Sequence, residues 1–460
     1  FSNDNRYLGY ATSKSGSDWK EFYVMDLKNN KILDDHLKWI KFSGMSWVEG
    51  GFYYSTFPKP KEGKEYSQSN EGSQVFFHKL GTDQIEDRLI YSDLKNPKIS
   101  NYASTTSDGR YLLLYRSKGT YGNSLLVKDL MKKDERFINI IDDFKSELSV
   151  VEDVNGSLLV MTDRGAPNKK IVLIDPKNPK ENNWKIIIPE KKYPLTMANL
   201  INDKIVVHYM TDVISSYKMH DTKGNFIKDI ELPGPGVSYG FGGNKNQSIS
   251  WYNFESLVHP PAVYIYNFDN DTSKEYYRSK AKFDKDKYVM KSDFYKTKDG
   301  TRIPIFIAHK KDLVLDGLAP TLLYGYGGFN ISQRPYFNKT IPVLLEKGGV
   351  YAVACIRGGG EYGQEWHEAG MLQNKQNVFD DFIAAGEYLI IEGYTSSDRL
   401  AIRGGSNGGT LVGAVINQKP NLFRVAFPEV GVMDMLRYEQ FTIGWAWAVE
   451  YGSVKNEKDF

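Results

Sequence analysis

The first 280 residues alternate apolar and polar positions with a period of two, in short runs that turn residues separate. Tyr, Val, Ile and Leu fill the runs, and Asn, Asp, Gly and Lys fill the gaps. Successive side chains of a strand point to opposite faces, so this alternation predicts half-buried β-strands with no helix among them. The predicted strands cover residues 7–12, 21–27, 51–57, 74–80, 111–117, 124–130, 158–163, 170–175, 204–210, 248–254 and 262–268.

These runs repeat at a regular interval. Similar runs begin near residues 7, 51, 110, 156, 203 and 247, at spacings of 44, 59, 46, 47 and 44 residues. A period in the mid-forties with about four strands per unit predicts a β-propeller. Six units can be counted, and a seventh is expected if the start of the chain is lost. A pair of large β-sandwiches remains the alternative.

The pattern changes after about residue 280. A lysine-rich linker covers residues 281–287, and a hairpin follows at 292–297 and 303–309. Strands are then predicted at 320–324, 350–356, 400–403 and 424–427, with an amphipathic helix at 378–392 that Gly393 ends. Near-continuous apolar strands separated by helices predict a buried, mostly parallel sheet. We therefore expect a β-propeller domain at 1–283 and an α/β-hydrolase catalytic domain at 284–460.

The main candidate for chemistry is Gly404-x-Ser406-x-Gly408, which joins the strand at 400–403 to a predicted helix at 410–418. This spacing is that of a nucleophile elbow, in which the chain turns sharply and exposes a serine. A β-carbon two residues to either side would crowd such a turn. Behind the serine, the backbone N–H of Asn407 is free to bind an oxyanion.

Two glycine-rich segments follow earlier strands, at residues 324–329 and 357–363. Ligands of α/β folds bind at the carboxyl ends of strands, which is where these segments lie. We expect the phenol of Tyr326 to supply the second oxyanion donor. Purely structural turns are the alternative, and neither segment has the spacing of a phosphate or dinucleotide loop.

Composition excludes several classes of protein. The net charge of +2 over 460 residues does not suggest a nucleic-acid binder, and no apolar stretch approaches the 18 residues of a membrane span. The single cysteine, Cys355, rules out an internal disulfide framework and lies in an apolar run, so we expect a buried thiol. The aromatic content of 14% favours a β-rich protein.

The general base of a serine hydrolase is not visible. All seven histidines precede Ser406, whereas the hydrolase order is Ser, Asp, His. The chain starts at Phe1 and stops at Phe460 without a terminal element, so we expect a fragment cut at both ends, with little or no turnover on its own. A signal peptide would have its place before Phe1.

Several motifs together resemble the prolyl oligopeptidase family of serine peptidases, over essentially the whole chain. They are LYGYGGFNI at 323–331, IRGGGEYG at 356–363, GGSNGG at 404–409, VGVMDML at 430–436, TIGWAW at 442–447, EYG at 450–452 and SGSDW at 15–19. The resemblance implies a seven-bladed propeller that caps the hydrolase domain and admits only short peptides. It also places the triad Asp and His, and a peptide-anchoring Arg, beyond Phe460.

The resemblance also implies roles for particular residues. Ser406 would be the nucleophile, with the Asn407 N–H and the Tyr326 hydroxyl as the oxyanion hole. Trp447 would stack its indole on the substrate proline. The other pocket residues implied are Phe329, Val432 and Tyr451, with Ile331 and Ile443 near them. Trp445 departs from the family pattern, where a smaller or polar residue is common.

We therefore expect a serine endopeptidase that cleaves short peptides on the carboxyl side of proline, without metal or cofactor. The expected partners are short proline-containing peptides, with no nucleic acid and no membrane, and the protein is expected to be a monomer. By resemblance it would be cytoplasmic, although a periplasmic or secreted location stays open. The alternatives are a non-catalytic peptide-binding protein and an oligopeptidase that cuts after basic residues. A dipeptidyl exopeptidase would need a Glu-Glu pair, which the sequence lacks.

Overall fold

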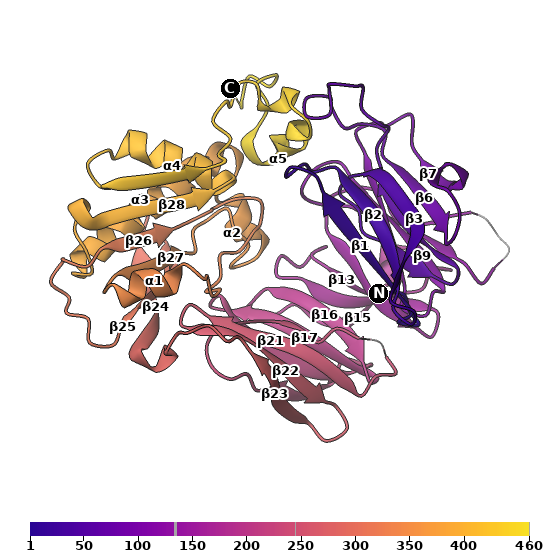
Figure 1. The fold of residues 1–460 in the computed structure, drawn as a ribbon, viewed down its shortest axis with the longest axis horizontal. Helices are drawn as coiled ribbons and strands as arrows, with labels where there is room; N and C mark the ends of the chain where they lie inside the picture. Colours follow the sequence, from indigo (N-terminus) through magenta and orange to yellow (C-terminus); the bar gives the residue numbers. More distant parts are fainter. Residues whose placement is uncertain (133–135, 244, 460) are drawn as a thin grey trace. The chain divides into compact units, whose positions relative to one another are not determined.

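The computed structural model describes residues 1–132, 136–243 and 245–459, and Figure 1 traces its elements along the chain. These residues form two compact units. The first comprises Phe1–Arg164, Ile171–Ile186 and Arg437–Val449. The second comprises Gly165–Lys170, Ile187–Leu436 and Glu450–Phe460.

The described residues up to 278 form five antiparallel sheets. The first contains β1 (Tyr7–Ser13), β2 (Lys20–Asp26), β3 (Lys31–Ile40), β4 (Ser46–Val48), β5 (Gly51–Thr56), β6 (Gln74–Lys79) and β7 (Arg88–Ser92). The second contains β8 (Ser100–Thr105), β9 (Tyr111–Ser117), β10 (Ser124–Asp129) and β11 (Ile138–Ile141). The third contains β12 (Leu148–Val154), β13 (Ser157–Thr162), β14 (Lys170–Ile174) and β15 (Lys185–Ile188). The fourth contains β16 (Leu195–Ile201), β17 (Lys204–Thr211), β18 (Ile214–Asp221) and β19 (Phe226–Ile230), and the fifth β20 (Val237–Gly240), β21 (Ile249–Ser256), β22 (His259–Asn267) and β23 (Thr272–Arg278).

The strand predictions for this region are confirmed. Each predicted strand is present, and its ends differ from the prediction by at most three residues. In the first sheet a single residue pair, Ile40 with Thr56, joins β3 to β5, so the sheet divides into a group of three strands and a group of four. With the four-stranded sheets this makes six groups, each a run of consecutive antiparallel strands, as the repeat predicts. A seventh blade stays a prediction.

The sixth sheet is mixed and carries the elbow. Its strands are β24 (Tyr288–Lys296), β25 (Arg302–Lys310), β26 (Thr321–Tyr324), β27 (Val350–Ala354), β28 (Leu400–Gly405) and β29 (Val425–Glu429), in the order β24-β25-β27-β26-β28-β29. The pairs from β27 to β29 are parallel, whereas β24 and β25 are antiparallel. The predicted hairpin and mostly parallel sheet are therefore confirmed.

Helices are few and are concentrated after residue 340. The α-helices are α1 (Ile341–Glu346), α2 (Gln364–Glu368), α3 (Lys375–Ile391), α4 (Asn407–Gln418) and α5 (Ala448–Tyr451). Single 3-10 turns cover Gln84–Glu86, Glu181–Asn183, Lys285–Lys287, Leu372–Asn374, Ser397–Arg399, Tyr438–Gln440 and Gly444–Trp447. Helix α4 begins three residues before the predicted position, because its first turn includes both glycines after Asn407. Within the described residues, no helix is long and apolar enough to cross a membrane.

The sixth sheet buries both faces, as parallel sheets require. On one face Ile303, Ile305 and Ile307 of β25 join a core with apolar residues of α3 and α4. The alternate residues Phe306 and Ala308 join a second core with α1 and with residues of the β17–β18 and β21–β22 hairpins. Cys355 lies in this second core and is fully buried, which confirms the predicted structural thiol, and burial raises the pKa of its thiol.

Candidate active site

The turn between β28 and α4 has the geometry of a nucleophile elbow. Ser406 has φ 56° and ψ −119°, a strained conformation for a residue other than glycine, and it is exposed between the half-buried Gly405 and the buried Asn407. A β-carbon on Gly404 would lie 2.2 Å from the carbonyl oxygen of Gly408, and one on Gly408 would lie 2.7 Å from that of Gly325. These distances leave room for glycine alone, so the predicted steric role of both glycines is confirmed.

Asn407 connects the elbow to two other segments. It is the first residue of α4, so its N–H has no acceptor within the helix. Its Nδ2 donates to the carbonyl oxygen of Tyr326 at 2.6 Å, and its Oδ1 accepts from the hydroxyl of Tyr451 at 3.0 Å. The first bond fixes the start of the helix relative to the turn that follows β26, and the second ties it to α5.

Tyr326 lies in that turn, next to the elbow. Its ring is half-buried, and burial raises the pKa of its phenol, although an interaction with the Ser406 side chain opposes this rise. The hydroxyl therefore stays protonated at neutral pH and is a hydrogen-bond donor beside the nucleophile. The N–H of Asn407 and the hydroxyl of Tyr326 can together bind an oxyanion.

An apolar wall stands beside these donors. The rings of Phe329 and Tyr451 pack edge to face with centroids 5.4 Å apart. Val432 is held against the elbow helix because its N–H and its carbonyl oxygen both bond the hydroxyl of Thr410 at 3.0 Å. Ile331 is 49% exposed. The structure thus brings Ser406 together with four of the predicted residues, which are Asn407, Tyr326, Tyr451 and Phe329. Thr410 holds Val432 against the same helix.

Trp447 and Ile443 lie in the segment Arg437–Val449, which belongs to the first unit. There the indole of Trp447 stacks on Tyr438 with centroids 6.4 Å apart. The neighbouring Trp445 is half-buried, and its Nε1 has no hydrogen-bond partner within the described residues. The roles predicted for Trp447 and Ile443 in the proline pocket stay predictions.

No histidine in the described part of the chain hydrogen-bonds to Ser406. The histidine after the second glycine-rich segment, His367, instead bonds the carboxylate of Glu450 at 2.8 Å. Arg357 in that segment pairs with Asp381 and Asp299, at 2.6 Å each. This segment is thus anchored by buried charge, which supports the structural alternative for it.

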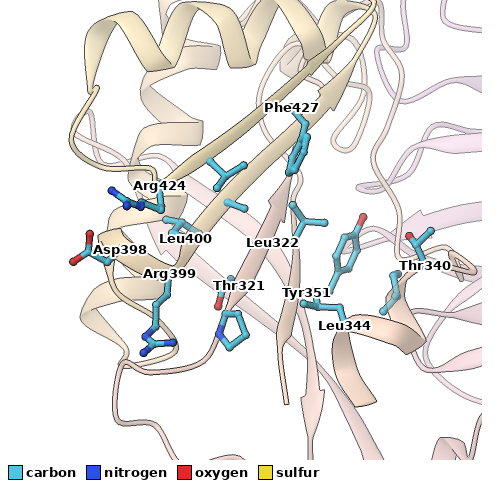
Figure 2. A pocket seen from close by; sticks show the side chains of 14 residues that line it. Thr321, Leu322, Thr340, Leu344, Tyr351, Asp398, Arg399, Leu400, Arg424 and Phe427 are labelled. Carbon is cyan, nitrogen blue, oxygen red and sulfur yellow. The ribbon is translucent and has the colours of Figure 1, made fainter. Parts of the chain in front are cut away.

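Figure 2 shows a pocket of about 450 Å³ on the same sheet. It is lined by Thr321 at the start of β26, Leu400 at the start of β28, and Arg424 just before β29. The apolar side chains of Leu344, Tyr351 and Phe427 also line it. The pocket therefore opens at the amino ends of the parallel strands. Ser406 follows the carboxyl end of β28, so this pocket is not the site that contains Ser406.

Two family models match the chain. The N-terminal β-propeller domain of prolyl oligopeptidase matches residues 1–279, and the prolyl oligopeptidase family matches residues 335–460. The chain belongs to the prolyl oligopeptidase family. Its fold is accordingly a β-propeller with an α/β-hydrolase catalytic domain, as the sequence predicts.

Similar proteins carry related names. The prolyl endopeptidase of Elizabethkingia meningoseptica is 44% identical over 460 residues, which are 100% of this chain and 65% of that protein. Prolyl oligopeptidase A of Amanita bisporigera is 34% identical, with 100% of this chain and 64% of that protein covered. Prolyl oligopeptidase B of Galerina marginata, bound to a 25mer macrocyclization substrate, superposes with a TM-score of 0.94 at 31% identity over 100% of this chain and 67% of that one. The chain thus spans about 65% of the length of its curated relatives.

Glu450 has no predicted role, although its neighbour Tyr451 is predicted to be a pocket residue. The carboxylate of Glu450 bonds the backbone N–H of Phe329 at 3.0 Å. The two residues are 121 positions apart. No local pattern signals such a contact, since a lone glutamate in a short helix is usually exposed.

Proposed function

We propose that this protein is a serine endopeptidase that cleaves short peptides on the carboxyl side of proline, by way of an acyl-enzyme on Ser406. The observation that supports the proposal is the strained, exposed Ser406 at the start of α4, with the phenol of Tyr326 close to its side chain. Family membership and the names of the relatives agree with it.

The proposed reaction uses these groups in sequence. The Oγ of Ser406 attacks the carbonyl carbon of the proline residue while its proton passes to a histidine base. The Asn407 N–H and the Tyr326 hydroxyl stabilise the negative charge that develops on the carbonyl oxygen. The peptide C–N bond breaks as the amine takes the proton, and water then hydrolyses the ester. The histidine base is an expectation from the family resemblance.

Specificity for proline would come from flat apolar walls. A pyrrolidine ring has no donor and fits between aromatic faces. The edge-to-face pair of Phe329 and Tyr451 supports such a pocket, with Val432 and Ile331 nearby. We assign the stacking role to Trp447, with Ile443 beside it.

The remaining proposals concern the domain boundary, the oligomeric state and the location of the protein. We place the boundary between the propeller and the catalytic domain at residues 283 and 284, in the lysine-rich segment that precedes β24. We further propose that the protein acts as a cytoplasmic monomer on short proline-containing peptides, without nucleic acid or membrane. Gel filtration with light scattering would test the monomer.

The decisive experiment is hydrolysis of a Gly-Pro reporter amide by the full-length protein. We expect turnover that Ser406→Ala abolishes, with a phosphonofluoridate adduct on Ser406 in the wild type alone. Trp447→Ala should cost about 1 kcal/mol or more in kcat/KM for prolyl substrates. Binding of a proline peptide without any hydrolysis would instead support the peptide-binding alternative, and preference for a lysyl or arginyl reporter would contradict proline specificity.

A further inference from the structure

A buried ion pair lies beneath the turn that carries Tyr326. The carboxylate of Glu450 is 1% exposed and pairs with the ammonium of Lys375 at 2.8 Å. Its second oxygen accepts from the Nε2 of His367 at 2.8 Å and from the N–H of Phe329 at 3.0 Å. The Nδ1 of His367 is buried and has no hydrogen-bond partner among the residues that the structure describes. Because Nε2 faces a carboxylate, this nitrogen carries a hydrogen and is the donor.

Both members of the ion pair bond the backbone of one short turn. Lys375 donates to the carbonyl oxygen of Gly327 at 2.9 Å, and Glu450 accepts from Phe329. Phe329 and Asn330 both have φ 58°, a left-handed conformation that residues other than glycine seldom adopt. Such a conformation persists only where the surroundings impose it, and the buried charges supply that constraint here.

The held turn is the one that presents the oxyanion donor. Tyr326 directly precedes Gly327, and its own carbonyl oxygen is held by Asn407. Segment 326–329 is therefore fixed at three backbone groups, the carbonyl oxygens of Tyr326 and Gly327 and the N–H of Phe329. Glu450 also precedes Tyr451, whose hydroxyl bonds the side chain of Asn407. The Nζ of Lys375 lies 5.5 Å from the centre of the Tyr451 ring. One ion pair thus contacts both the turn and the residue that orients Asn407.

We propose that Glu450 and Lys375 are positioning residues that set the hydroxyl of Tyr326 opposite Ser406. The proposal rests on the peptidase function proposed above. Neither side chain touches the reacting atoms in this role. Each fixes the direction of a backbone group, because a buried charge without its partner would be costly and the pair therefore keeps its geometry.

The charge of Glu450 agrees with this role. Burial alone would raise the pKa of Glu450, but the bond from His367 and the charge of Lys375 hold that pKa below its usual value. The carboxylate is therefore ionised at neutral pH. In Glu450→Gln the amide has a single acceptor oxygen, so it cannot serve Lys375, His367 and Phe329 together.

The test combines Glu450→Gln with Tyr326→Phe in the full-length protein. We expect Glu450→Gln to lower kcat for the Gly-Pro reporter about tenfold, with KM changed less than about twofold. The reason is that a displaced oxyanion donor loses part of the transition-state stabilisation that a deleted donor loses completely. In the Tyr326→Phe background the same substitution should have little further effect on kcat, because both changes remove one donor. An equal loss in both backgrounds would overturn the proposal in favour of a merely structural role.

A second measurement does not depend on turnover. Amide hydrogen exchange of the peptide 325–331 should be about tenfold faster in Glu450→Gln, with the amides of α4 unchanged. If the wild type hydrolyses no reporter but exchange accelerates, the proposed function fails and the positioning role stands. If exchange and kcat are both unchanged while the wild type is active, the positioning role fails alone. Lys375→Gln gives the same readouts should Glu450→Gln not fold.

Asp87 supplies a matched control. Its side chain is equally buried, at 1% exposed, and it likewise bonds a buried histidine, His78, at 2.7 Å. It also accepts from the hydroxyl of Tyr54 at 2.7 Å, within the first propeller sheet. Asp87→Asn should lower stability but leave kcat and the exchange of 325–331 unchanged. A loss of kcat as large as that of Glu450→Gln would show that any buried charge has the effect, and would overturn the proposal.

Discussion

Substitution by alanine should have very different effects on activity at two adjacent glycines of the elbow, Gly404 and Gly405. A β-carbon on Gly404 would lie 2.2 Å from the carbonyl oxygen of Gly408, 2.5 Å from its carbonyl carbon and 2.9 Å from its α-carbon. All three atoms are backbone, so no side chain can move aside. A β-carbon on Gly405 would meet nothing closer than an oxygen of Glu429, at 3.9 Å. Gly404→Ala and Gly405→Ala therefore form a matched pair one residue apart.

The magnitude follows from the distances. Contacts of 3.0–3.4 Å are the tightest that a real β-carbon tolerates. Strand β28 and the first turn of α4 must therefore separate by about 1 Å, which costs about 3 kcal/mol for an overpacked site. A displacement of about 1 Å at reacting groups costs roughly 100-fold in rate. Gly404→Ala should therefore lower kcat/KM about 100-fold as well as Tm.

The assay is reporter hydrolysis and thermal unfolding of the full-length enzyme. Gly405→Ala is expected to keep kcat/KM within about twofold of the wild type, since its methyl group enters open space. Wild-type activity and Tm in Gly404→Ala would refute the steric argument. An equal loss in Gly405→Ala would also refute it, because crowding by Gly408 would then not be the cause.

Three other outcomes are expected. Tyr451→Phe should lower kcat about threefold to tenfold, because Asn407 loses a hydrogen bond worth about 1 kcal/mol; unchanged steady-state kinetics would contradict this. Burial raises the pKa of the Glu361 carboxyl to about 8, because the folded protein favours the protonated form. The contribution of this group to the free energy of unfolding is therefore complete below the pKa of the unfolded chain, and it is lost as the pH rises through 8. Glu361→Gln should thus raise stability by up to about 5 kcal/mol near pH 8 and by little near pH 4, and a pH-independent difference in Tm would count against it. Residues 1–460 produced alone should hydrolyse the reporter far more slowly than the full-length protein, since no described histidine bonds Ser406; equal rates would reject this.

Local patterns predicted most of the elements. The alternation along β22 is a clear case, because half-buried and buried residues alternate over its whole length. The elbow was likewise predicted from five residues, since the contact that requires glycine at position 404 is with Gly408, four positions away in the chain. The short helices α1 and α2 were not predicted, because five or six residues are too few to show a helical period.

The candidate site was predicted only in part. Ser406, Asn407 and Tyr326 were found from the elbow and the glycine turn, while the pocket residues came from the family resemblance. No role was predicted for Glu450, Lys375 or His367. They act on the turn at 326–329 from other elements, and a buried glutamate and a surface glutamate look alike in sequence.

The sequence by itself determined where strands, helices and the sharp turn at Ser406 form, because those features depend on residues within a few positions of one another. It also determined the family, through motifs that persist as contiguous strings. Only the tertiary structure decided which side chains hold the Tyr326 turn. The bond between Glu450 and Phe329 joins residues 121 positions apart, and His367 meets Glu450 across 83. Such contacts depend on how whole elements pack, so they leave no periodic trace in the chain.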